Sequence, residues 1–237
     1  MTGSDLKKTS PRRRVGIFGG SFDPIHLGHV ALAELFCQLL QLDELLVIPA
    51  GNPWQKSGLI ANATDRVTMV ALAMQDLNAR LGHDHPVQVK IDEREILRGK
   101  ASYTFETLTE LRNEYGKDAS LCLLLGADQL ARLHTWHEWE RLLELAHLCI
   151  AARPGYSLET ATLAATLQNQ IEKGLTKPAQ LHRASHGKVI LASTLAVDIS
   201  STTIRYQLAH GIAPLDYLGP AVLDYIQQHH LYIENQN

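Results

Sequence analysis

Short apolar runs recur along this chain, and each is followed by a stretch with the periodicity of a helix. Several of the runs are nearly continuous in apolar residues, which is typical of strands that are covered on both faces, as in a parallel sheet. In chain order they are VGIF (15–18), ELLVIPA (44–50), VQVKI (87–91), SLCLLLG (120–126), HLCIAAR (147–153) and KVILAS (188–193). Repeated strand–helix–strand units make right-handed crossovers, so the sequence predicts an α/β fold with a doubly wound, mainly parallel sheet.

Helical patterns fill the intervals between these runs. They are LGHVALAELFCQLL (27–40), TDRVTMVALAMQDLNARLG (64–82), YTFETLTELRNEYG (103–116) and SLETATLAATLQNQIEKG (157–174), followed by closing stretches at 201–211 and 220–230. In the first of them, Leu32, Leu35, Phe36 and Leu39 are expected to share one buried face. The second is expected to have Thr64 as its N-cap.

Charged residues are distributed unevenly along the chain. The 237 residues carry a formal net charge of −3, whereas the first residues contain an excess of Lys and Arg. We expect residues 1–13 to be a disordered basic tail and residues 14–237 to form a single domain that ends in helices. The acidic balance of this domain argues against nucleic acid as a partner.

The apolar segments also indicate in which cellular compartment the protein is expected. No run approaches the roughly 20 residues that span a bilayer, so no membrane partner is expected. The basic start is not followed by the apolar segment of a secretory signal, which favours a cytoplasmic location. Cys37, Cys122 and Cys149 each lie within an apolar segment. Their odd number and their surroundings predict buried, reduced thiols rather than a disulfide or a metal cluster.

The stretch GIFGGSFDPIHLGHV (16–30) stands where the first strand should turn into the first helix. In a doubly wound sheet, ligands bind at such a place. Gly19 and Gly20 let the backbone approach a ligand closely, and the amides of Gly20, Ser21 and Phe22 can then act as donors. The N-terminus of the helix adds N–H groups that favour phosphate.

Two histidines, His26 and His29, stand three residues apart at the start of this helix, where they would share a face and point toward the same anion. The glycine spacing matches neither the dinucleotide-binding pattern G-x-G-x-x-G nor a Walker A loop. A metal site is disfavoured because no nearby Cys or carboxylate completes a set of ligands. The alternative that stays open is a plain glycine turn with two surface histidines.

The segment GGSFDPIHLGH resembles the H-x-G-H signature of the nucleotidyltransferase superfamily, whose members transfer AMP or CMP onto phosphorylated acceptors. The usual companion of this signature, a Ser/Thr-rich turn that opens a late helix, is matched by ISSTTIR (199–205). Ser200, Ser201 and Thr202 can cap that helix and donate to phosphate, and Arg205 can reach the same oxyanions. The two motifs together predict a Rossmann-like nucleotidyltransferase fold.

Within this superfamily the chain is most similar to bacterial nicotinate-nucleotide adenylyltransferases, from about Arg14 to the C-terminus. The matching segments are IPAGNPWQKSG (48–58), SYTFETL (102–108), LLGADQLARLHTWHEW (124–139) and ARPGY (152–156). The loop after the second strand departs from the usual pattern, since it reads NPWQK without consecutive prolines and a His before the lysine. The resemblance implies that ATP and nicotinate mononucleotide give nicotinate adenine dinucleotide and pyrophosphate, a step of NAD biosynthesis.

The resemblance also implies roles for individual residues. His26 and His29 would bind the ATP phosphates, with His29 nearest to the leaving group, and Arg205 would complete this catalytic set. Contacts to phosphate are expected from Gly20, Ser21, Phe22, Ser200, Ser201 and Thr202. Contacts to the acceptor are expected from Lys56, Thr104, Asp128, Trp136, His137 and Arg153. Mg²⁺ is expected to be held mainly by the phosphates of ATP.

For two of these residues a structural role stays open beside the functional one. Asp128 could bind ribose hydroxyls or act as the N-cap of the segment that follows it. Trp136 could stack on the pyridine ring or simply fill the core. For Asp128 the two roles do not exclude each other.

Other features have no assigned role. Trp54 and Trp139 are expected to be packing or loop residues, and His83 and His85 resemble a metal pair but are expected in a solvated turn. The function has rivals as well, namely adenylyl transfer to nicotinamide mononucleotide or phosphopantetheine, and a non-catalytic nucleotide sensor. Assembly into a homo-oligomer also stays open.

Overall fold

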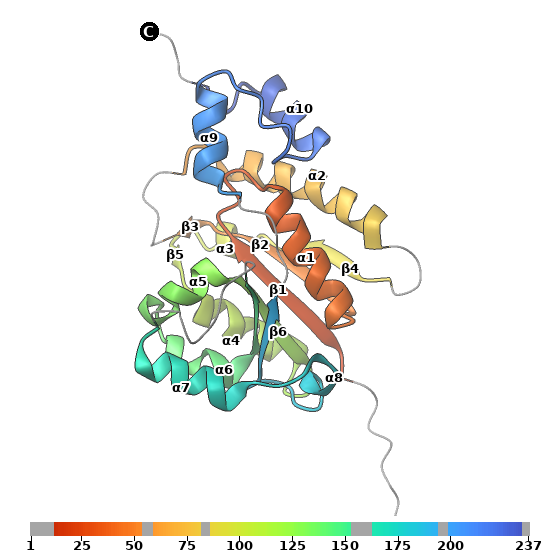
Figure 1. Cartoon of the computed structure of the whole chain (residues 1–237), viewed down its shortest axis with the longest axis vertical. Coiled ribbons are helices and arrows are strands. Elements are labelled where there is room, and N and C mark those ends of the chain that lie inside the picture. Colours follow the sequence, from red (N-terminus) through yellow and green to blue (C-terminus); the bar gives the residue numbers. More distant parts are fainter. Residues whose placement is uncertain (1–11, 54–58, 82–85, 153–162, 194–198, 234–237) are drawn as a thin grey trace, which may run out of the picture.

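The computed structural model describes residues 12–53, 59–81, 86–152, 163–193 and 199–233, and these residues make up the fold and the site below. The main sheet has six strands, all parallel, in the order β4-β2-β1-β6-β7-β8 (Figure 1). The strands are β1 Arg14–Gly20, β2 Glu44–Pro49, β4 Gln88–Ile91, β6 Ser120–Gly126, β7 His147–Ala152 and β8 Val189–Ser193. Every apolar run of the sequence is therefore a strand, and the predicted doubly wound α/β fold is confirmed.

The strand order turns at β1. From there the chain adds β2 and β4 on one side of the sheet and later β6, β7 and β8 on the other. The loops that follow β1 and β6 therefore separate and leave a crevice beyond the carboxyl ends of these strands, where open α/β sheets bind ligands. A second, two-stranded sheet that the sequence did not predict pairs β3, Asn52–Pro53, with β5, Ala101–Ser102.

Helices cover both faces of the main sheet. The α-helices are α1 Leu27–Leu39, α2 Ala63–Leu81, α3 Arg94–Leu97, α4 Thr104–Tyr115, α5 Ala127–Arg132, α6 Leu142–Leu145, α7 Ala165–Gly174, α8 Pro178–Leu181, α9 Ser201–Ala209 and α10 Pro220–Gln228, with 3-10 turns η1 Leu133–Thr135 and η2 Trp139–Arg141. In Figure 1, α1, α2, α9 and α10 lie on one side of the sheet, and α4 to α7 lie on the other.

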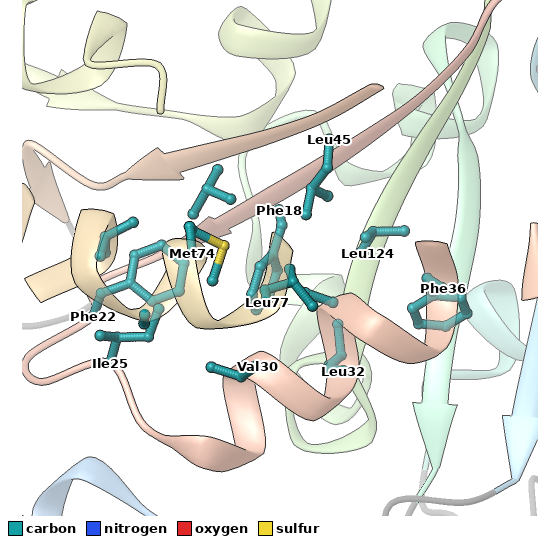
Figure 2. Packing of buried hydrophobic residues seen from close by; sticks show 14 of the residues in the cluster. Phe18, Phe22, Ile25, Val30, Leu32, Phe36, Leu45, Met74, Leu77 and Leu124 are labelled. Atoms are coloured by element: carbon teal, nitrogen blue, oxygen red, sulfur yellow. The ribbon is translucent and has the colours of Figure 1, made fainter. Parts of the chain in front are cut away.

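Each face of the sheet has its own hydrophobic core. Successive residues of a strand point to opposite faces, so Leu45 packs into one core and Leu46 into the other. Figure 2 shows the first core, in which Phe18 of β1, Phe36 of α1 and Leu77 of α2 meet. Burial on both faces is the reason why the strands read as continuous apolar runs.

Two details of the helices differ from the prediction. Leu39 is 36% exposed, because in the last turn of α1 the buried side is formed by Phe36 and Cys37 and Leu39 lies off that side. Thr64 is not the N-cap of α2, since the helix begins at Ala63. The Oδ1 atom of Asn62 instead accepts the N–H of Asp65 at 2.9 Å. The sequence offers two good capping residues here, and the structure uses the first of them.

Cys37, Cys122 and Cys149 are buried free thiols, as predicted. Burial raises the pKa of the Cys37 thiol to about 12, so it packs as a small apolar side chain. Among the helices of the described residues, none is long and apolar enough to cross a membrane.

A buried histidine fixes the start of β7. His147 is fully buried, and its Nδ1 atom accepts the backbone N–H of Lys188 at 3.1 Å. The Nε2 atom lies 3.2 Å from the carbonyl oxygen of Ala184, so the neutral ring carries its proton there. Burial lowers the pKa of His147 to about 4. A proton on Nδ1 would break the bond to Lys188.

This arrangement predicts a loss of stability in mild acid. The unfolded histidine titrates near 6.5 and the folded one near 4, so the unfolded state takes up a proton first as the pH falls. Between pH 7 and pH 4 the free energy of unfolding should drop by up to about 3 kcal/mol on account of this residue. Urea unfolding at several pH values measures this slope.

The variant His147→Asn provides the comparison, because its amide oxygen can accept the N–H of Lys188 without titrating. Its pH slope should be shallower than that of the wild type. The exposed His134 is the control, and His134→Asn should keep the wild-type slope. Parallel slopes for wild type and His147→Asn would contradict the prediction.

Candidate active site

A cavity of about 380 Å³ opens beyond the carboxyl ends of β1, β2 and β6. This is the crevice that the strand order creates. Sequence-predicted residues that line it are Gly20, Ser21, His26, His29, Thr104, Asp128, Trp136, His137, Ser200, Ser201 and Thr202. The two motifs from opposite ends of the chain therefore meet at one cavity, together with residues from its middle.

The loop after β1 is held in a narrow range of shapes. A Cβ atom on Gly20 would lie 2.9 Å from the ring of Phe22, so only glycine fits there. Phe22 itself has a left-handed backbone with φ of 46° and is buried in the core beneath the loop. Its ring meets the ring of His29 edge to face, at 5.2 Å between centroids. Phe22 thus supports the site from below with its side chain.

The carbonyl groups of this loop are bound on its outer side. The carbonyl of Gly20 accepts the N–H of Ala50 at 2.8 Å. The carbonyl of Ser21 accepts Nη1 of Arg66, also at 2.8 Å. In a trans peptide the C=O and N–H groups point to opposite sides, so the amides of Ser21 and Phe22 face away from these partners. This is the orientation that the predicted phosphate contacts require.

Arg66 is a residue of the site region that sequence reasoning missed. It lies on α2 and is only 1% exposed, and burial lowers its pKa. The buried residues of α2 are Arg66, Met69, Val70, Ala73, Met74 and Leu77. A charged residue that falls on the apolar face of a predicted helix was the available signal.

The two histidines form a stacked pair at the start of α1. His26 is the N-cap, and its backbone N–H donates to Nδ1 of His29 at 3.2 Å. The rings lie 3.7 Å apart between centroids at an angle of 25°. A Cβ on Gly28 would come within 3.1 Å of the His26 ring, so glycine allows this ring its place. Since Nδ1 of His29 accepts a bond, its neutral ring carries the proton on Nε2.

The start of α9 closes the same side of the cavity. Ser200 is the N-cap, as predicted, and its Oγ accepts the N–H of Thr203 at 3.1 Å. The hydroxyl of Ser201 donates to the carbonyl of Pro24 at 3.1 Å, which joins the two motifs directly. Thr202 follows in the first turn of the helix and also lines the cavity.

Arg205 has a different position from its neighbours in the motif. Its Nη1 donates to the carbonyl of Asp23 at 2.7 Å, and its Nη2 lies 3.5 Å from Oγ1 of Thr202. Arg205 is not among the described residues that line the cavity. The guanidinium therefore binds the backbone of the loop after β1. Its contact with phosphate stays a prediction.

Asp128 and Trp136 can both be placed. The N-cap of α5 is Gly126, and Asp128 lies inside the first turn, so the expectation that Asp128 caps this helix is wrong. Its carboxylate is exposed at the cavity. Trp136 lines the cavity and also packs against the second core, while its buried indole N–H has no hydrogen-bond partner among the described residues. Trp139 packs against the same core, as predicted.

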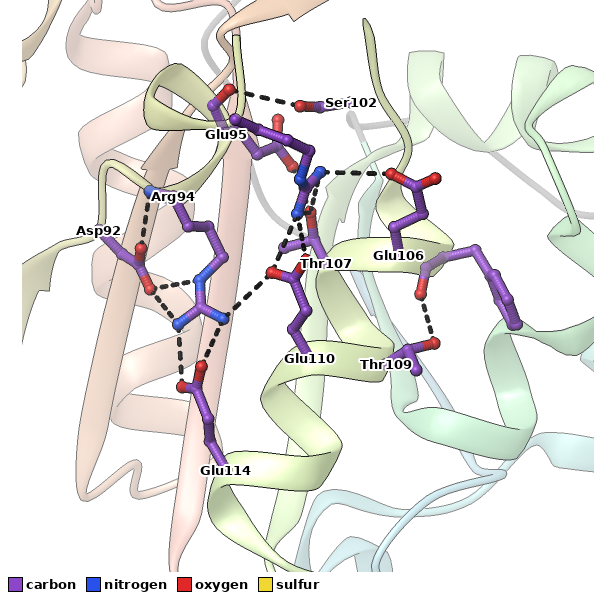
Figure 3. Close-up of polar contacts among 11 residues, drawn as sticks. Asp92, Arg94, Glu95, Ser102, Glu106, Thr107, Thr109, Glu110 and Glu114 are labelled. Atoms are coloured by element: carbon purple, nitrogen blue, oxygen red, sulfur yellow. Dashed lines mark hydrogen bonds and ion pairs between the residues drawn. The ribbon is translucent and has the colours of Figure 1, made fainter. Parts of the chain in front are cut away.

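A network of ion pairs supports the wall formed by α3 and α4 (Figure 3). Arg94 joins Asp92 at 2.7 Å and Glu114 at 2.9 Å. Arg98 joins Glu110 at 3.0 Å. These pairs join α3 to α4.

Glu95 is a second residue that sequence reasoning missed. It lines the cavity, its carboxylate accepts the hydroxyl of Thr107 at 2.8 Å, and burial raises its pKa. The carbonyl of Glu95 accepts the hydroxyl of Ser102 at 3.4 Å. A Cβ on Gly51 would lie 2.1 Å from this carbonyl, so α3 rests directly on the loop after β2. No local pattern in the sequence announces these contacts.

Several predicted features fall outside the described residues. These are Lys56, Arg153, Trp54, His83 and His85. Among the described residues there is no group of three or more His, Cys, Asp or Glu that could hold a metal ion.

Comparisons with known proteins agree with this site. The family model described as cytidylyltransferase-like matches residues 17–207. A protein of Herminiimonas arsenicoxydans named probable nicotinate-nucleotide adenylyltransferase is 47% identical over 223 residues, which cover 94% of this chain and 98% of the relative. A relative of the same name from Aeromonas hydrophila is 40% identical over 222 residues, covering 92% and 96%.

Solved structures extend the likeness to the fold. A Plasmodium falciparum nicotinic acid mononucleotide adenylyltransferase complexed with NaAD superposes with a TM-score of 0.67 at 19% identity, over 93% of this chain and 98% of the other. At this identity the match concerns the fold alone. The family model, in contrast, spans most of the sequence and both motifs that meet at the cavity, and the chain therefore belongs to the cytidylyltransferase-like family.

Proposed function

We infer that this protein is an adenylyltransferase that transfers AMP from ATP to nicotinate mononucleotide, which gives nicotinate adenine dinucleotide and pyrophosphate in NAD biosynthesis. The observation that carries this inference is the convergence of the glycine loop, the histidine pair and the start of α9 on one cavity. Two relatives that are 47% and 40% identical and align over nearly their whole length are named after this activity.

The reaction needs positioning and charge rather than a covalent nucleophile. The acceptor is a phosphate monoester with a second pKa near 6, so it is mostly a dianion at neutral pH. One of its oxygens attacks the α-phosphorus of ATP, and the bond from that phosphorus to the bridging oxygen of pyrophosphate breaks. Negative charge moves onto pyrophosphate, where N–H and O–H donors can stabilise it.

The residues around the triphosphate have the chemistry for this task. We propose that Nε2–H of His29 donates to the phosphate oxygens nearest to the leaving group, with His26 stacked beside it. At the start of α9, the hydroxyls of Ser200 and Thr202 would donate as well, and Ser201, whose hydroxyl donates to Pro24, would contribute its backbone N–H. The backbone amides of Gly20, Ser21 and Phe22 are proposed to bind phosphate as well. The orientation of the peptide groups supports this for Ser21 and Phe22, and for Gly20 the proposal rests on the sequence alone. Arg205 would contribute Nη2, since Nη1 holds the loop.

The acceptor is proposed to bind in the half of the cavity formed by the middle of the chain. Trp136 presents an aromatic face on which the pyridine ring can stack, and the main chain near Thr104 and His137 can bind the carboxylate. Asp128, exposed at the cavity, is proposed for the ribose hydroxyls. Lys56 and Arg153 are proposed for the acceptor on the sequence alone.

Mg²⁺ is proposed to enter with ATP. The described residues include no cluster of His, Cys, Asp and Glu that could hold the ion by itself. Oxygen atoms of the phosphates are ligands that Mg²⁺ prefers, and the ion usually keeps several waters in such sites. When bound, it would neutralise part of the charge of the triphosphate.

Product analysis tests the proposed function. The purified protein is incubated with ATP, Mg²⁺ and one of three acceptors, namely nicotinate mononucleotide, nicotinamide mononucleotide or phosphopantetheine. We expect pyrophosphate release to be fastest with nicotinate mononucleotide, with the dinucleotide as product. Faster release with another acceptor would reassign the substrate, and binding of ATP without release for any acceptor would indicate a nucleotide sensor.

The variant His29→Ala should lower kcat by about 100-fold or more, because it removes a donor that acts on the developing charge. The fold should persist with a modest loss of stability, since the N–H of His26 loses one acceptor. Steady-state kinetics and a melting curve measure both effects. His134→Ala, at an exposed position outside the described cavity lining, is the control and should behave as the wild type. Activity of His29→Ala within a few-fold of the wild type would rule out the assigned role.

The variant Trp136→Ala should raise KM for the acceptor roughly three- to tenfold and KM for ATP much less, because a stacking contact is lost. Trp139→Ala is the matched control, since both indoles pack against the same core but Trp139 is not among the described residues of the cavity lining. Equal kinetic effects of the two variants would reduce Trp136 to a packing residue.

A further inference from the structure

We propose that Tyr232, near the end of the chain, is a positioning residue for the triphosphate, because it fixes Asp23 in the loop that carries the phosphate-binding amides. This inference rests on the proposed function. It assigns a role in the reaction to the C-terminal segment, which contributes no group to the cavity lining among the described residues beyond α9.

Asp23 is the central residue of this arrangement. It is only 3% exposed, and its carboxylate accepts three hydrogen bonds. The N–H groups of Ile60 and Ala61 donate at 2.9 and 3.1 Å, and the hydroxyl of Tyr232 donates at 2.8 Å. A buried carboxylate is costly unless donors surround it, so these three bonds fix the side chain and its backbone.

Tyr232 is built into the core rather than attached to the surface. Its side chain is 7% exposed and belongs to the core that contains α1, α2 and α10. Its backbone has a φ of 63°, in the left-handed region that a tyrosine rarely adopts. Burial and the neighbouring Asp23 raise the pKa of the Tyr232 hydroxyl, so it stays a donor at any working pH. The fold therefore holds this residue in a strained conformation with its hydroxyl on Asp23.

Backbone strain also occurs next to Asp23, the acceptor of the bond from Tyr232. Phe22, directly before Asp23, has a φ of 46°. Non-glycine residues in this region persist only where their surroundings fix them. The bond from the strained Tyr232 ends on Asp23, the residue next to the strained Phe22, and thus helps to keep the loop in the shape that orients its amides.

Tyr232 holds the side chain of Asp23, whereas other contacts of the loop hold its backbone. The carbonyl of Ser21 is held by Arg66, that of Asp23 by Arg205 and that of Pro24 by Ser201. Among the described residues, the Asp23 carboxylate is held by Tyr232 and by the N–H groups of residues 60–61. Losing the hydroxyl would let Phe22 and Asp23 relax together, and small displacements of donors around a reacting group cost large factors in rate.

A second tyrosine makes a matched control. The hydroxyl of Tyr225 on α10 donates to Oδ1 of Asp65 on α2 at 2.9 Å. Like the bond from Tyr232, this one joins a tyrosine hydroxyl of the C-terminal segment to an aspartate. It ends on α2, however, and does not involve the loop after β1. The variants Tyr232→Phe and Tyr225→Phe each remove one hydroxyl and one tyrosine–aspartate bond.

The experiment compares both variants with the wild type in the full-length protein. We measure kcat, KM for ATP and for nicotinate mononucleotide, the melting temperature, and the equilibrium binding of ATP alone. Tyr232→Phe should lower kcat about tenfold and weaken ATP binding several-fold, less than the roughly 100-fold expected when a donor is displaced by about 1 Å. KM for the acceptor should change little. Tyr225→Phe should keep wild-type kinetics and ATP affinity.

Opposite results overturn the inference. If Tyr232→Phe has kcat and ATP affinity within twofold of the wild type, or if both variants lose activity in proportion to their melting temperatures, Tyr232 is a structural residue only. A wild type that releases no pyrophosphate with any acceptor refutes the proposed function instead. In that case the ATP affinities of the two variants still decide whether Tyr232 positions the loop.

Discussion

The constraint on which the site depends is the orientation of the peptide groups in the loop after β1. A polyphosphate is repelled by carbonyl oxygens and bound by N–H groups, so the loop can serve it only if its carbonyls face elsewhere. The structure meets this requirement with four partners from three places, which are Ala50 after β2, Arg66 on α2, and Ser201 and Arg205 on α9. A buried guanidinium is well suited to this purpose, since its several donors satisfy carbonyls that water does not reach.

The side of the cavity that is proposed to bind the acceptor is organised differently. Its wall consists of α3 and the start of α4, whose residues are close in sequence, and it is held by ion pairs that involve the partly buried Arg94 and Arg98. Exposed ion pairs contribute little to stability, so the packing of the Glu95 carbonyl on Gly51 and Ser102 matters more for the position of this wall. The pairs keep the cationic groups neutralised and the wall rigid.

The sequence predicts the strands and the motifs of this protein better than the long-range contacts that join them. Most of the strands could be predicted because burial on both faces makes them nearly continuous apolar runs, whereas β4 alternates between exposed and partly buried residues. The histidines and Ser200 to Thr202 could be predicted because they stand in compact motifs. The errors at Leu39, Thr64 and Asp128 concern the ends of helices, where several residues compete for one role. The sequence does give a signal for Arg66, because a charged residue on the apolar face of a predicted helix needs a buried partner. It gives no signal for the bond between Asp23 and Tyr232, since the two residues lie 209 positions apart and neither has an unusual neighbourhood in the sequence.

These long-range connections imply an order in which the site can become competent. The glycine loop, α1 and β1 are adjacent in the sequence and can adopt their local structure early, whereas the bonds from Ser201, Arg205 and Tyr232 require the last part of the chain to dock on α1 and α2. Closing such distant contacts is the slow and entropically costly part of folding. The ring of Phe22 packs on Phe18 and His29, which are near in sequence, but the next residue, Asp23, is held by Arg205 and Tyr232 from the last part of the chain. The geometry proposed to bind phosphate therefore depends on the completed fold and not only on the motif that identifies it.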